Sequence, residues 1–526
     1  MLSRAVLIFA VVISLAACQS QKKEINFPKT DLSAIALIPK PVKTIATNSA
    51  FGLDSNTVIF TSLSDPKFEK AGRFLAEKVN ARLGFNLSVN NTSNEKEIDR
   101  VIYINQSDSV DLKTPESYQL YIKKDSIYLN AKTAAGAFRG VQTLRQLIPE
   151  QSNDTLTDHP LWLIPTGKIY DEPQFGYRGA MLDVARHFFT VDEVKKFIDL
   201  LAYYKYNALH LHLTDDQGWR LEIKSWPKLT EIGGQSEVGG GEGGFFTQED
   251  YKDLVQYAAD RHMIIIPEVD MPGHTNAASL SYPFLHAGGK ADTPRVRTDM
   301  KVGYSSFHAR KDTVYAFLDD VIREIAAITP GPYFHIGGDE SHVTTKKDYL
   351  HFVEKVEKIV KKHGKQAIGW NEIAQAKIDP STIAQLWNEP HSAQKAAEGG
   401  SKIIMSPAKK TYLDMKYDSL SEYGLTWAGM IPVDVAYNWS PENYVEGLPK
   451  EQILGIEAPL WSETISNSAE LEYLAFPRAI GYSELGWSKP ENRNWEDYRK
   501  RLAQQVPYLN RMEVNYYPSK LIDWAK

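Results

Sequence analysis

The stretch HIGGDESH, residues 335–342, places two carboxyl side chains next to each other, Asp339 and Glu340, directly after two glycines. Acidic side chains are rarely buried without a partner, and two that lie close together repel. Packing therefore gives no reason for the pair. Two carboxyl groups at one site can instead divide an acid–base reaction, one holding a proton and the other a negative charge. Asp339 and Glu340 are thus candidate catalytic residues.

The elements that must position this pair follow a repeating pattern. In the larger, second part of the chain, short apolar segments that end in polar residues alternate with longer amphipathic segments, which is typical of βα units. The candidate strands cover residues 177–185, 208–216, 263–270, 333–340, 366–372, 382–388, 402–407 and 453–463. Helix starts are indicated by Thr190 with Glu193 and by Thr247 with Asp250, which fit capping patterns. The eight units predict an α/β fold, a (β/α)8 TIM barrel over residues 172–526.

In barrels of this kind the reactive groups gather at the C-terminal ends of the strands. Every candidate strand here ends in, or is followed by, a charged or aromatic residue. In chain order these residues are Arg186, Asp215, Asp216, Glu268, Asp270, His274, Asp339, Glu340, Trp370, Trp387, Tyr412, Asp414, Trp461 and Glu463. One such end could reflect solvation alone, but eight successive ends predict a single site that is lined for a small polar ring.

Residues 34–165 show a different pattern, in which strand-like runs such as TVIF and RVIYI alternate with helical ones. The segment ESYQLYIKKDSIYLNAK predicts two strands joined by a turn at Lys124 and Asp125. The segment AAGAFRGVQTLRQLIP predicts a helix that Pro149 ends. We therefore expect a smaller α+β domain before the barrel. It carries no catalytic cluster, which favours a role in stability or orientation.

The N-terminus predicts export. The segment MLSRAVLIFAVVISLAA, residues 1–17, has a basic residue before an apolar run that is too short to span a bilayer, which is typical of a signal peptide. LAAC resembles a bacterial lipobox, which implies cleavage before Cys18, lipid attachment to Cys18 and a polar tether over residues 18–33. The alternative is a plain secretory signal followed by a chance cysteine, which also predicts export. We expect a lipoprotein anchored at the cell envelope, in the periplasm or at the outer membrane.

Composition narrows the class of partner. The 526-residue chain has 60 Lys and Arg against 66 Asp and Glu, which gives no indication of a nucleic-acid-binding surface. The partner is expected to be neutral. Aromatic residues make up 11% of the chain, and aromatic side chains with polar tips suit sugar rings as well as protein cores. Cys18 is the only cysteine, so the monomer cannot form a disulfide.

The motifs at the predicted strand ends resemble those of family 20 glycoside hydrolases, the β-N-acetylhexosaminidases. The segments are RGAMLDVARHFF, HLHLTDDQGWR, PEVDMPGH, HIGGDE, YLD and WSE, and they occur in the order of that family. The resemblance covers the chain from about Ala34 to its C-terminus. It implies a (β/α)8 barrel after a small α+β domain, and a carbohydrate substrate with a terminal N-acetylhexosamine. It implies no cofactor and no metal.

The resemblance also implies how the carboxyl pair works. Glycosidases usually employ two carboxyl groups at the scissile bond, but in this family the 2-acetamido oxygen of the substrate is the nucleophile. Glu340 would be the general acid, and Asp339 would orient the acetamide nitrogen and stabilise an oxazolinium-like intermediate. Asp215 and His274 would form a relay towards Glu340, with Asp270 beside it. We expect the side chains of the pair to diverge as they leave a strand, so that each addresses a different part of one sugar.

Further residues would bind the sugar. The candidates are Arg186, Trp370, Trp387, Tyr412, Asp414, Trp427, Trp461 and Glu463, of which the resemblance assigns Trp370, Trp387 and Trp461 to the walls, whereas Trp427 lies in a loop that the sequence does not place. The rigid donor fork of Arg186 and the carboxylates of Asp414 and Glu463 suit sugar hydroxyl groups. Tyr412 can donate to the acetamide oxygen. The tryptophans would form walls around the ring.

A pocket that holds every hydroxyl group of one ring leaves no path for a sugar chain beyond it. The predicted enzyme is therefore exo-acting and retaining, and it releases terminal N-acetylglucosamine or N-acetylgalactosamine. Two alternatives remain. His210 and His212 share one strand face, as in metal-dependent barrel hydrolases such as zinc amidohydrolases, although the two side chains also suit a hydrogen-bonded inner layer of the barrel. A non-catalytic lipoprotein that only binds sugars would not need Glu340.

Overall fold

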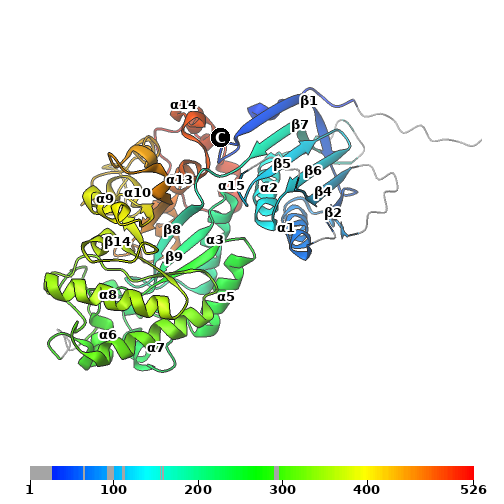
Figure 1. The fold of residues 1–526 in the computed structure, drawn as a ribbon. Coiled ribbons are helices and arrows are strands. Elements are labelled where there is room, and N and C mark those ends of the chain that lie inside the picture. Colours follow the sequence, from blue (N-terminus) through cyan, green and yellow to red (C-terminus); the bar gives the residue numbers. More distant parts are fainter. Residues whose placement is uncertain are drawn as a thin grey trace, which may run out of the picture.

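The computed structural model describes residues 26–62, 65–91, 100–108, 113–153, 156, 159–289 and 295–525. The predicted signal peptide over residues 1–17 and the predicted lipidation site, Cys18, lie outside these ranges. Within the ranges, no helix combines the length and the apolar character needed to cross a membrane. The described chain forms two parts, a smaller sheet domain and a barrel, which lie beside each other in Figure 1.

The first part is a seven-stranded sheet with helices on one face (Figure 1). In spatial order its strands are β1 (Lys43–Leu53), β7 (Trp162–Asp171), β5 (Tyr118–Ile122), β6 (Ser126–Ala131), β4 (Val101–Gln106), β2 (Val58–Thr61) and β3 (Val89–Asn90). The helices are α1 (Pro66–Leu83) and α2 (Ala134–Leu147). The predicted turn at Lys124 and Asp125 joins β5 to β6, which pair in antiparallel register. The predicted α+β domain is confirmed.

The predicted end of this domain at residue 165 is wrong, because β7 continues to Asp171. Pro165 does not end the strand. It lies opposite Ala50, next to a register shift between β1 and β7, whereas β5 joins β7 only from Gly167 onward. A proline is tolerated in a strand where a bulge already interrupts the ladder.

The predicted tether over residues 18–33 is too long. Its last residues belong to the sheet domain, because Leu32 is buried in the core of that domain and Asp31 caps the short helix η1 (Leu32–Ala34). Thr30 also donates a hydrogen bond to the backbone of Ser49 in β1. One apolar residue in a polar segment has no periodicity, so its burial could not be predicted from the pattern.

The second part is a closed parallel barrel, as predicted. Its eight strands are β8 (Tyr177–Asp183), β9 (Ala208–His212), β12 (Ile264–Glu268), β13 (Tyr333–His335), β14 (Gln366–Trp370), β15 (Ile383–Leu386), β16 (Ile403–Met405) and β17 (Ile453–Leu460), and β17 pairs with β8. The longer helices after these strands are α3 (Val191–Tyr203), α5 (Gln248–Ala259), α7 (Asp312–Ile328), α8 (Lys346–Lys362), α9 (Pro390–Glu398), α12 (Ser468–Ala475), α13 (Arg478–Trp487) and α14 (Trp495–Ala503). Capping boxes start α3 at Thr190 and α5 at Thr247, as the sequence predicts.

Short elements occupy several loops of the barrel. They include the hairpin of β10 (Thr214–Asp215) with β11 (Gly218–Trp219), and the helices α4 (Lys228–Glu231), α6 (Asn276–Ser281), α10 (Ala408–Thr411), α11 (Val433–Tyr437) and α15 (Val506–Arg511). Of these elements, β10 carries Asp215 beyond the end of β9, and α10 directly precedes Tyr412.

The interior of the barrel contains a polar layer around Glu268. This carboxylate accepts hydrogen bonds from His212 Nδ1 at 2.6 Å and from Trp370 Nε1 at 3.0 Å, and His210 Nε2 lies 2.9 Å away. His210 also contacts Glu457 at 2.9 Å. Burial alone would raise the pKa of Glu268, but the surrounding histidines hold it well below its ordinary value. His210 and His212 thus belong to a hydrogen-bonded inner layer.

Buried ion pairs join the sheet domain to the barrel. Asp171, at the end of β7, lies 2.8 Å from Lys205 of the barrel and accepts a hydrogen bond from the indole of Trp487 at 2.9 Å. Glu116 of the sheet domain likewise contacts Arg178, the second residue of the barrel strand β8, at 2.5 Å. Removing one partner of such a pair leaves a buried charge, so these contacts fix how the two parts meet.

Candidate active site

A pocket of about 410 Å³ opens at the C-terminal ends of the barrel strands. Its lining residues are Arg186, His274, Met300, Val302, Asp339, Glu340, Trp370, Trp387, Tyr412, Asp414, Leu425, Trp427, Trp461 and Glu463. The structure thus brings together every residue predicted to bind the sugar, including Trp427 from a loop that the sequence could not place. Of the predicted catalytic residues, Asp339, Glu340 and His274 line the pocket, whereas Asp215 and Asp270 lie behind them.

A turn at two glycines positions the side chains of Asp339 and Glu340 in this pocket. β13 ends at His335, and the chain then turns through Gly337 and Gly338, whose φ angles of 64° and 90° are left-handed. A β-carbon on Gly337 would lie 1.7 Å from Oδ1 of Asp270, and that same oxygen accepts a hydrogen bond from the backbone of Gly338 at 3.1 Å. The expectation that the pair leaves directly from a strand is therefore wrong. A tight turn around Asp270 sets the directions of both side chains.

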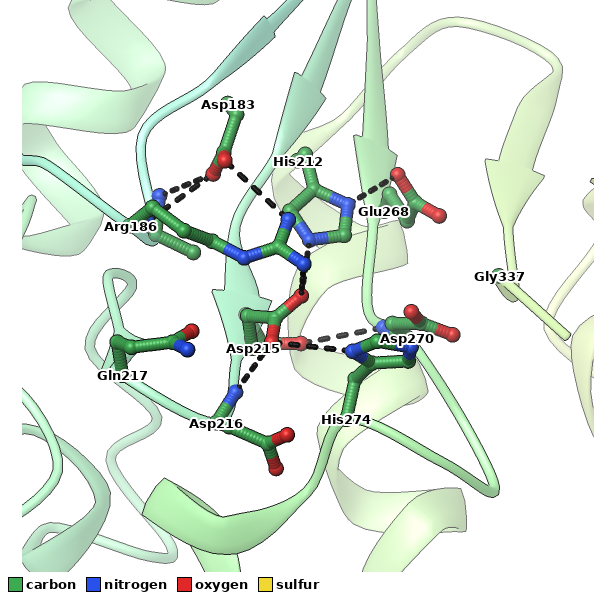
Figure 2. Close-up of polar contacts among 12 residues, drawn as sticks. Asp183, Arg186, His212, Asp215, Asp216, Gln217, Glu268, Asp270, His274 and Gly337 are labelled. Carbon is green, nitrogen blue, oxygen red and sulfur yellow. Dashed lines mark hydrogen bonds and ion pairs between the residues drawn. The ribbon is translucent and has the colours of Figure 1, made fainter. Parts of the chain in front are cut away.

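A chain of charged groups runs from Arg186 through Asp215 to His274, as Figure 2 shows, and His274 in turn faces the carboxyl pair. Arg186 Nη2 lies 2.8 Å from Asp215 Oδ2, and Asp215 Oδ1 lies 3.2 Å from His274 Nδ1. On its other side, His274 Nε2 lies 3.8 Å from Asp339 Oδ1 and 4.0 Å from Glu340 Oε1. The predicted arrangement of Asp215 and His274 pointing towards Glu340 is present.

The charges along this chain follow from burial and from the neighbouring ions. Burial alone would raise the pKa of Asp215, but Arg186 and His274 hold it far below its ordinary value. Burial alone would lower the pKa of His274, but Asp215, Asp339 and Asp270 raise it well above its ordinary value. His274 is therefore a cation at neutral pH. Its positive charge faces both members of the carboxyl pair.

Asp216 holds the loop that carries His274. The backbone of His274 has a φ of 56°, a left-handed conformation that residues other than glycine rarely adopt. Asp216 Oδ1 accepts hydrogen bonds from Asn276 N at 2.8 Å and from Ser305 Oγ at 2.6 Å, and Ser305 Oγ accepts one from Thr275 N at 2.8 Å. The motif that contains Asp216 did not predict a role for it. In the structure it fixes the segment on which the histidine sits.

Asp339 and Asp270 are buried close together. Burial, followed by the charge of Asp270, raises the pKa of Asp339 well above its ordinary value. Burial also raises the pKa of Asp270, to about 6, although His274 opposes this shift. The two carboxyl groups of the pair differ in access to solvent, since the Asp339 side chain is 11% exposed and that of Glu340 is 29% exposed. Asp339 thus faces the enclosed end of the pocket and Glu340 its mouth.

Hydrogen-bonding atoms face the pocket from the neighbouring strands. Both carboxylate oxygens of Asp414 and Oε2 of Glu463 are buried without a hydrogen-bond partner among the described residues. Burial raises the pKa of each of these two carboxyl groups. Arg186 is held by Asp183 at 3.2 Å and lies over the ring of Trp461. Fixed acceptors and a fixed donor group around one cavity are suited to the hydroxyl groups of a single sugar ring.

Aromatic rings form the remaining walls. Trp370 lies beside Trp461, with ring centroids 5.6 Å apart, and Trp387 is stacked on Tyr412 at 6.4 Å. Trp427 stands edge-on to Tyr412 at 5.7 Å and is 57% exposed, so it forms the rim of the pocket. These rings belong to the site and not only to the core, as predicted.

Four residues near the site were missed by the sequence reasoning. Met300, Val302 and Leu425 line the pocket from loops, and no spacing or composition marked them. Glu372 lies behind the wall, where its carboxylate accepts a hydrogen bond from the indole of Trp387. It follows Trp370 by two residues at the end of a predicted strand, which was a usable signal.

Two family models match the chain. One is glycosyl hydrolase family 20, catalytic domain, over residues 175–490, and the other is glycosyl hydrolase family 20, domain 2, over residues 34–172. The junction between the two matched ranges falls directly after β7, where the sheet domain ends. Together they span both parts of the described structure.

Individual relatives agree with these matches. The chain is 37% identical to a β-N-acetylhexosaminidase of Cellulomonas fimi over 494 residues, 93% of this chain and 97% of that protein. The structure of the family 20 β-N-acetylhexosaminidase from Streptomyces coelicolor A3(2) is similar with a TM-score of 0.88 and 42% identity, over 94% of this chain and 100% of that one. A mutant Streptomyces plicatus β-hexosaminidase in complex with its product GlcNAc is similar with a TM-score of 0.88 and 42% identity, over 94% of this chain and 99% of that one.

Substitution of Gly337 tests whether the turn around Asp270 positions the carboxyl pair. In Gly337→Ala the new methyl group would overlap Asp270, so the turn must move and Asp339 and Glu340 move with it. A shift of the order of an ångström in reacting groups costs roughly 100-fold in rate, and we expect kcat/KM on an aryl 2-acetamido glycoside to fall by about that factor. The measurement is steady-state kinetics on purified protein.

Gly364→Ala is the matched control. Gly364 is also left-handed, with a φ of 73°, but a β-carbon there meets no atom within 4 Å. This variant carries the same backbone strain without the overlap, and its kcat/KM should equal that of the unmodified protein. Equal activity of the two variants would show that Asp270 does not constrain the turn.

Proposed function

Since the chain belongs to glycosyl hydrolase family 20, we propose that it is an exo-acting β-N-acetylhexosaminidase that removes terminal N-acetylglucosamine or N-acetylgalactosamine with retention of configuration. The observation that carries the proposal is the carboxyl pair at the closed pocket. Asp339 points into a cavity for one ring, and Glu340 lies at its mouth, where the glycosidic oxygen of a bound terminal sugar would be.

The reaction has two steps at the anomeric carbon. In the first, the acetamide oxygen of the substrate attacks that carbon while the bond to the leaving oxygen breaks, and Glu340 gives its proton to the leaving oxygen. This forms an oxazolinium ring. In the second, Glu340, now ionised, takes a proton from a water molecule that attacks the anomeric carbon, and ring opening restores the acetamide. Two inversions at one carbon leave the configuration unchanged.

Asp339 and His274 supply the electrostatics of this reaction. Asp339 accepts the acetamide N–H and, as an anion, stabilises the positive charge of the oxazolinium ring. The cationic His274, 4.0 Å from Glu340, stabilises the negative charge that Glu340 acquires when it gives up its proton. Asp215 keeps His274 charged and oriented through the contact at 3.2 Å. Asp270 acts indirectly, because it shapes the turn that carries the pair.

The shape of the pocket accounts for exo action. Arg186, Asp414 and Glu463 offer hydrogen bonds to the hydroxyl groups of one sugar, and the aromatic walls enclose its faces. A ring whose hydroxyl groups are all held in this way is the last unit of its chain. The rest of the substrate lies outside, beyond Glu340 and the rim residue Trp427.

The two alternative functions lack support. The ring nitrogens of His210 and His212 make four close contacts with Glu268, Glu457 and Asp215, which a zinc amidohydrolase site would have to break. A lipoprotein that only binds sugar does not need a proton-donating group at the mouth of the pocket. The relatives reported above are named as hydrolases over most of this chain.

A set of aryl β-glycosides that differ only at C2 tests the proposal. The enzyme should hydrolyse the 2-acetamido substrate, whereas replacing the acetamide with a hydroxyl group removes the nucleophile. An internal nucleophile is worth several powers of ten in rate, so we expect kcat/KM to fall roughly 1000-fold or more. Comparable rates on the two substrates would contradict substrate assistance.

Replacement of the acid tests the role of Glu340. Glu340→Gln cannot donate a proton to the leaving oxygen, and kcat on an unactivated disaccharide should fall by roughly 100-fold to 10,000-fold. On a nitrophenyl glycoside, whose leaving group needs little protonation, the first step should be affected less. Glu398→Gln, at an exposed carboxylate on α9, is the control and should retain full activity. A uniform and small loss on both substrates would remove Glu340 as the acid.

The location of the enzyme is a separate proposal. Residues 1–17 have the pattern of a signal peptide and LAAC precedes Cys18, so the protein is exported and anchored at the cell envelope by a lipid on Cys18. The polar residues after Cys18 then connect the anchor to the sheet domain, to which Thr30 is joined by its hydrogen bond with Ser49.

Detergent phase partitioning of the full-length chain expressed in a bacterial host tests the anchor. The unmodified protein should enter the detergent phase, and Cys18→Ser should move to the aqueous phase, because it has no site for the lipid. If both proteins partition into the aqueous phase and both are exported, the segment is a plain secretory signal.

A further inference from the structure

Glu372 lies immediately behind the pocket wall. It follows β14 in the short helix η4 (Asn371–Gln375), and both of its carboxylate oxygens lie 3.1 Å from the indole Nε1 of Trp387. Trp387 itself lines the pocket and stacks on Tyr412. Glu372 does not line the pocket, and the indole of Trp387 connects it by hydrogen bonds to a side chain that does.

The neighbouring residue holds the same tryptophan by its backbone. Asn371 Oδ1 accepts a hydrogen bond from Trp387 N at 3.0 Å and one from Asn388 N at 3.3 Å, and Asn371 Nδ2 donates to Asn388 Oδ1 at 2.9 Å. Asn371 and Glu372 together therefore clamp both the backbone and the side chain of Trp387. The two residues that follow β14 therefore set the position of Trp387, which follows β15 and forms part of the pocket wall.

The carboxyl group of Glu372 also interacts electrostatically with the acidic residues of the site. In addition to burial, the charges of Asp339 and Glu340 raise the pKa of Glu372, and the charge of Glu372 raises that of Tyr349 on α8. Burial and then the charge of Asp339 raise the pKa of Glu372 to about 8, in spite of the hydrogen bond from Trp387. At neutral pH the group carries a proton. A neutral carboxyl can still accept the indole N–H through its carbonyl oxygen, and it adds no third negative charge beside the pair.

We propose that Glu372 is a positioning residue that holds the indole of Trp387 in the pocket wall against the bound sugar. This inference rests on the function proposed above and deepens it. A wall held by a hydrogen bond keeps its distance to the sugar fixed. Without the acceptor, the indole keeps its stacking contact with Tyr412 and its edge contact with Trp427, neither of which is a hydrogen bond.

Two substitutions at Glu372 test the proposal. Glu372→Ala removes the acceptor, and kcat/KM on an aryl 2-acetamido glycoside should fall by roughly tenfold, the value of one hydrogen bond of ordinary strength. Glu372→Gln keeps an oxygen acceptor in the same place and should restore activity to near that of the unmodified enzyme at pH 6. We expect an ionisation near pH 8 in the pH profile of the unmodified enzyme, and the profile of Glu372→Gln should lack it. Unimpaired Glu372→Ala, or Glu372→Gln as impaired as Glu372→Ala, would overturn the proposal.

A double-mutant cycle tests whether Glu372 acts through Trp387. Trp387→Phe keeps an aromatic ring but removes the N–H donor, so adding Glu372→Ala to it should cost no further activity. An undiminished tenfold loss in that background would show that Glu372 acts by another route. Thermal unfolding of each variant shows whether it is folded, and Glu372→Leu, which also lacks the acceptor but fills more of the space, replaces Glu372→Ala in the cycle if Glu372→Ala fails to fold. The proposed function is tested separately by the aryl glycosides that differ at C2, because that experiment uses the unmodified enzyme and no variant at Glu372.

Discussion

The contact between Asp270 and the backbone of Gly337 and Gly338 is the constraint on which the site depends. The carboxylate accepts the Gly338 N–H at 3.1 Å and occupies the space that a side chain on Gly337 would need. The chain can pass this carboxylate only because both glycines adopt left-handed conformations. The following pair, Asp339 and Glu340, is thus placed by a residue of the preceding strand unit. A buried carboxylate here shapes the backbone in addition to carrying charge.

The site also depends on how the charges of its carboxyl groups are balanced. A cluster of carboxyl groups in an enclosed space is unfavourable unless cations compensate or protons are retained. Arg186 and His274 provide the cations, and both are held by Asp215, whose pKa is low because of them. Burial raises the pKa values of Asp339 and Asp270, which no cation contacts as closely. Asp215 is thus a structural anion, whereas the charge of Asp339 and Asp270 responds to what is bound.

The sequence reasoning succeeded where a property repeats along the chain. All eight barrel strands and the polar groups at their ends could be predicted, because a strand buried on both faces is apolar and the mouth of the barrel is not. The sequence reasoning failed for residues whose position depends on a contact with a distant segment of the chain. Leu32 looked like part of a tether, since the sheet that buries it is formed by later residues. Glu372 was overlooked because its partner, Trp387, belongs to the next strand. The left-handed turn at Gly337 was not predicted either, since it follows from Asp270.

The same burial that opposes ionisation in the free site favours the reaction. Asp339 lies at the enclosed end of the pocket, where few solvent dipoles can screen its charge, and an anion there interacts more strongly with a nearby cation than it would in water. The acetamide N–H and the positive charge of the oxazolinium ring both stabilise the ionised form of Asp339. Its ionisation is therefore coupled to the arrival of an acetamido sugar and strengthens as the intermediate forms. A 2-hydroxyl sugar brings neither the N–H nor the intermediate, so the pocket selects its substrate by the same interaction that accelerates the reaction.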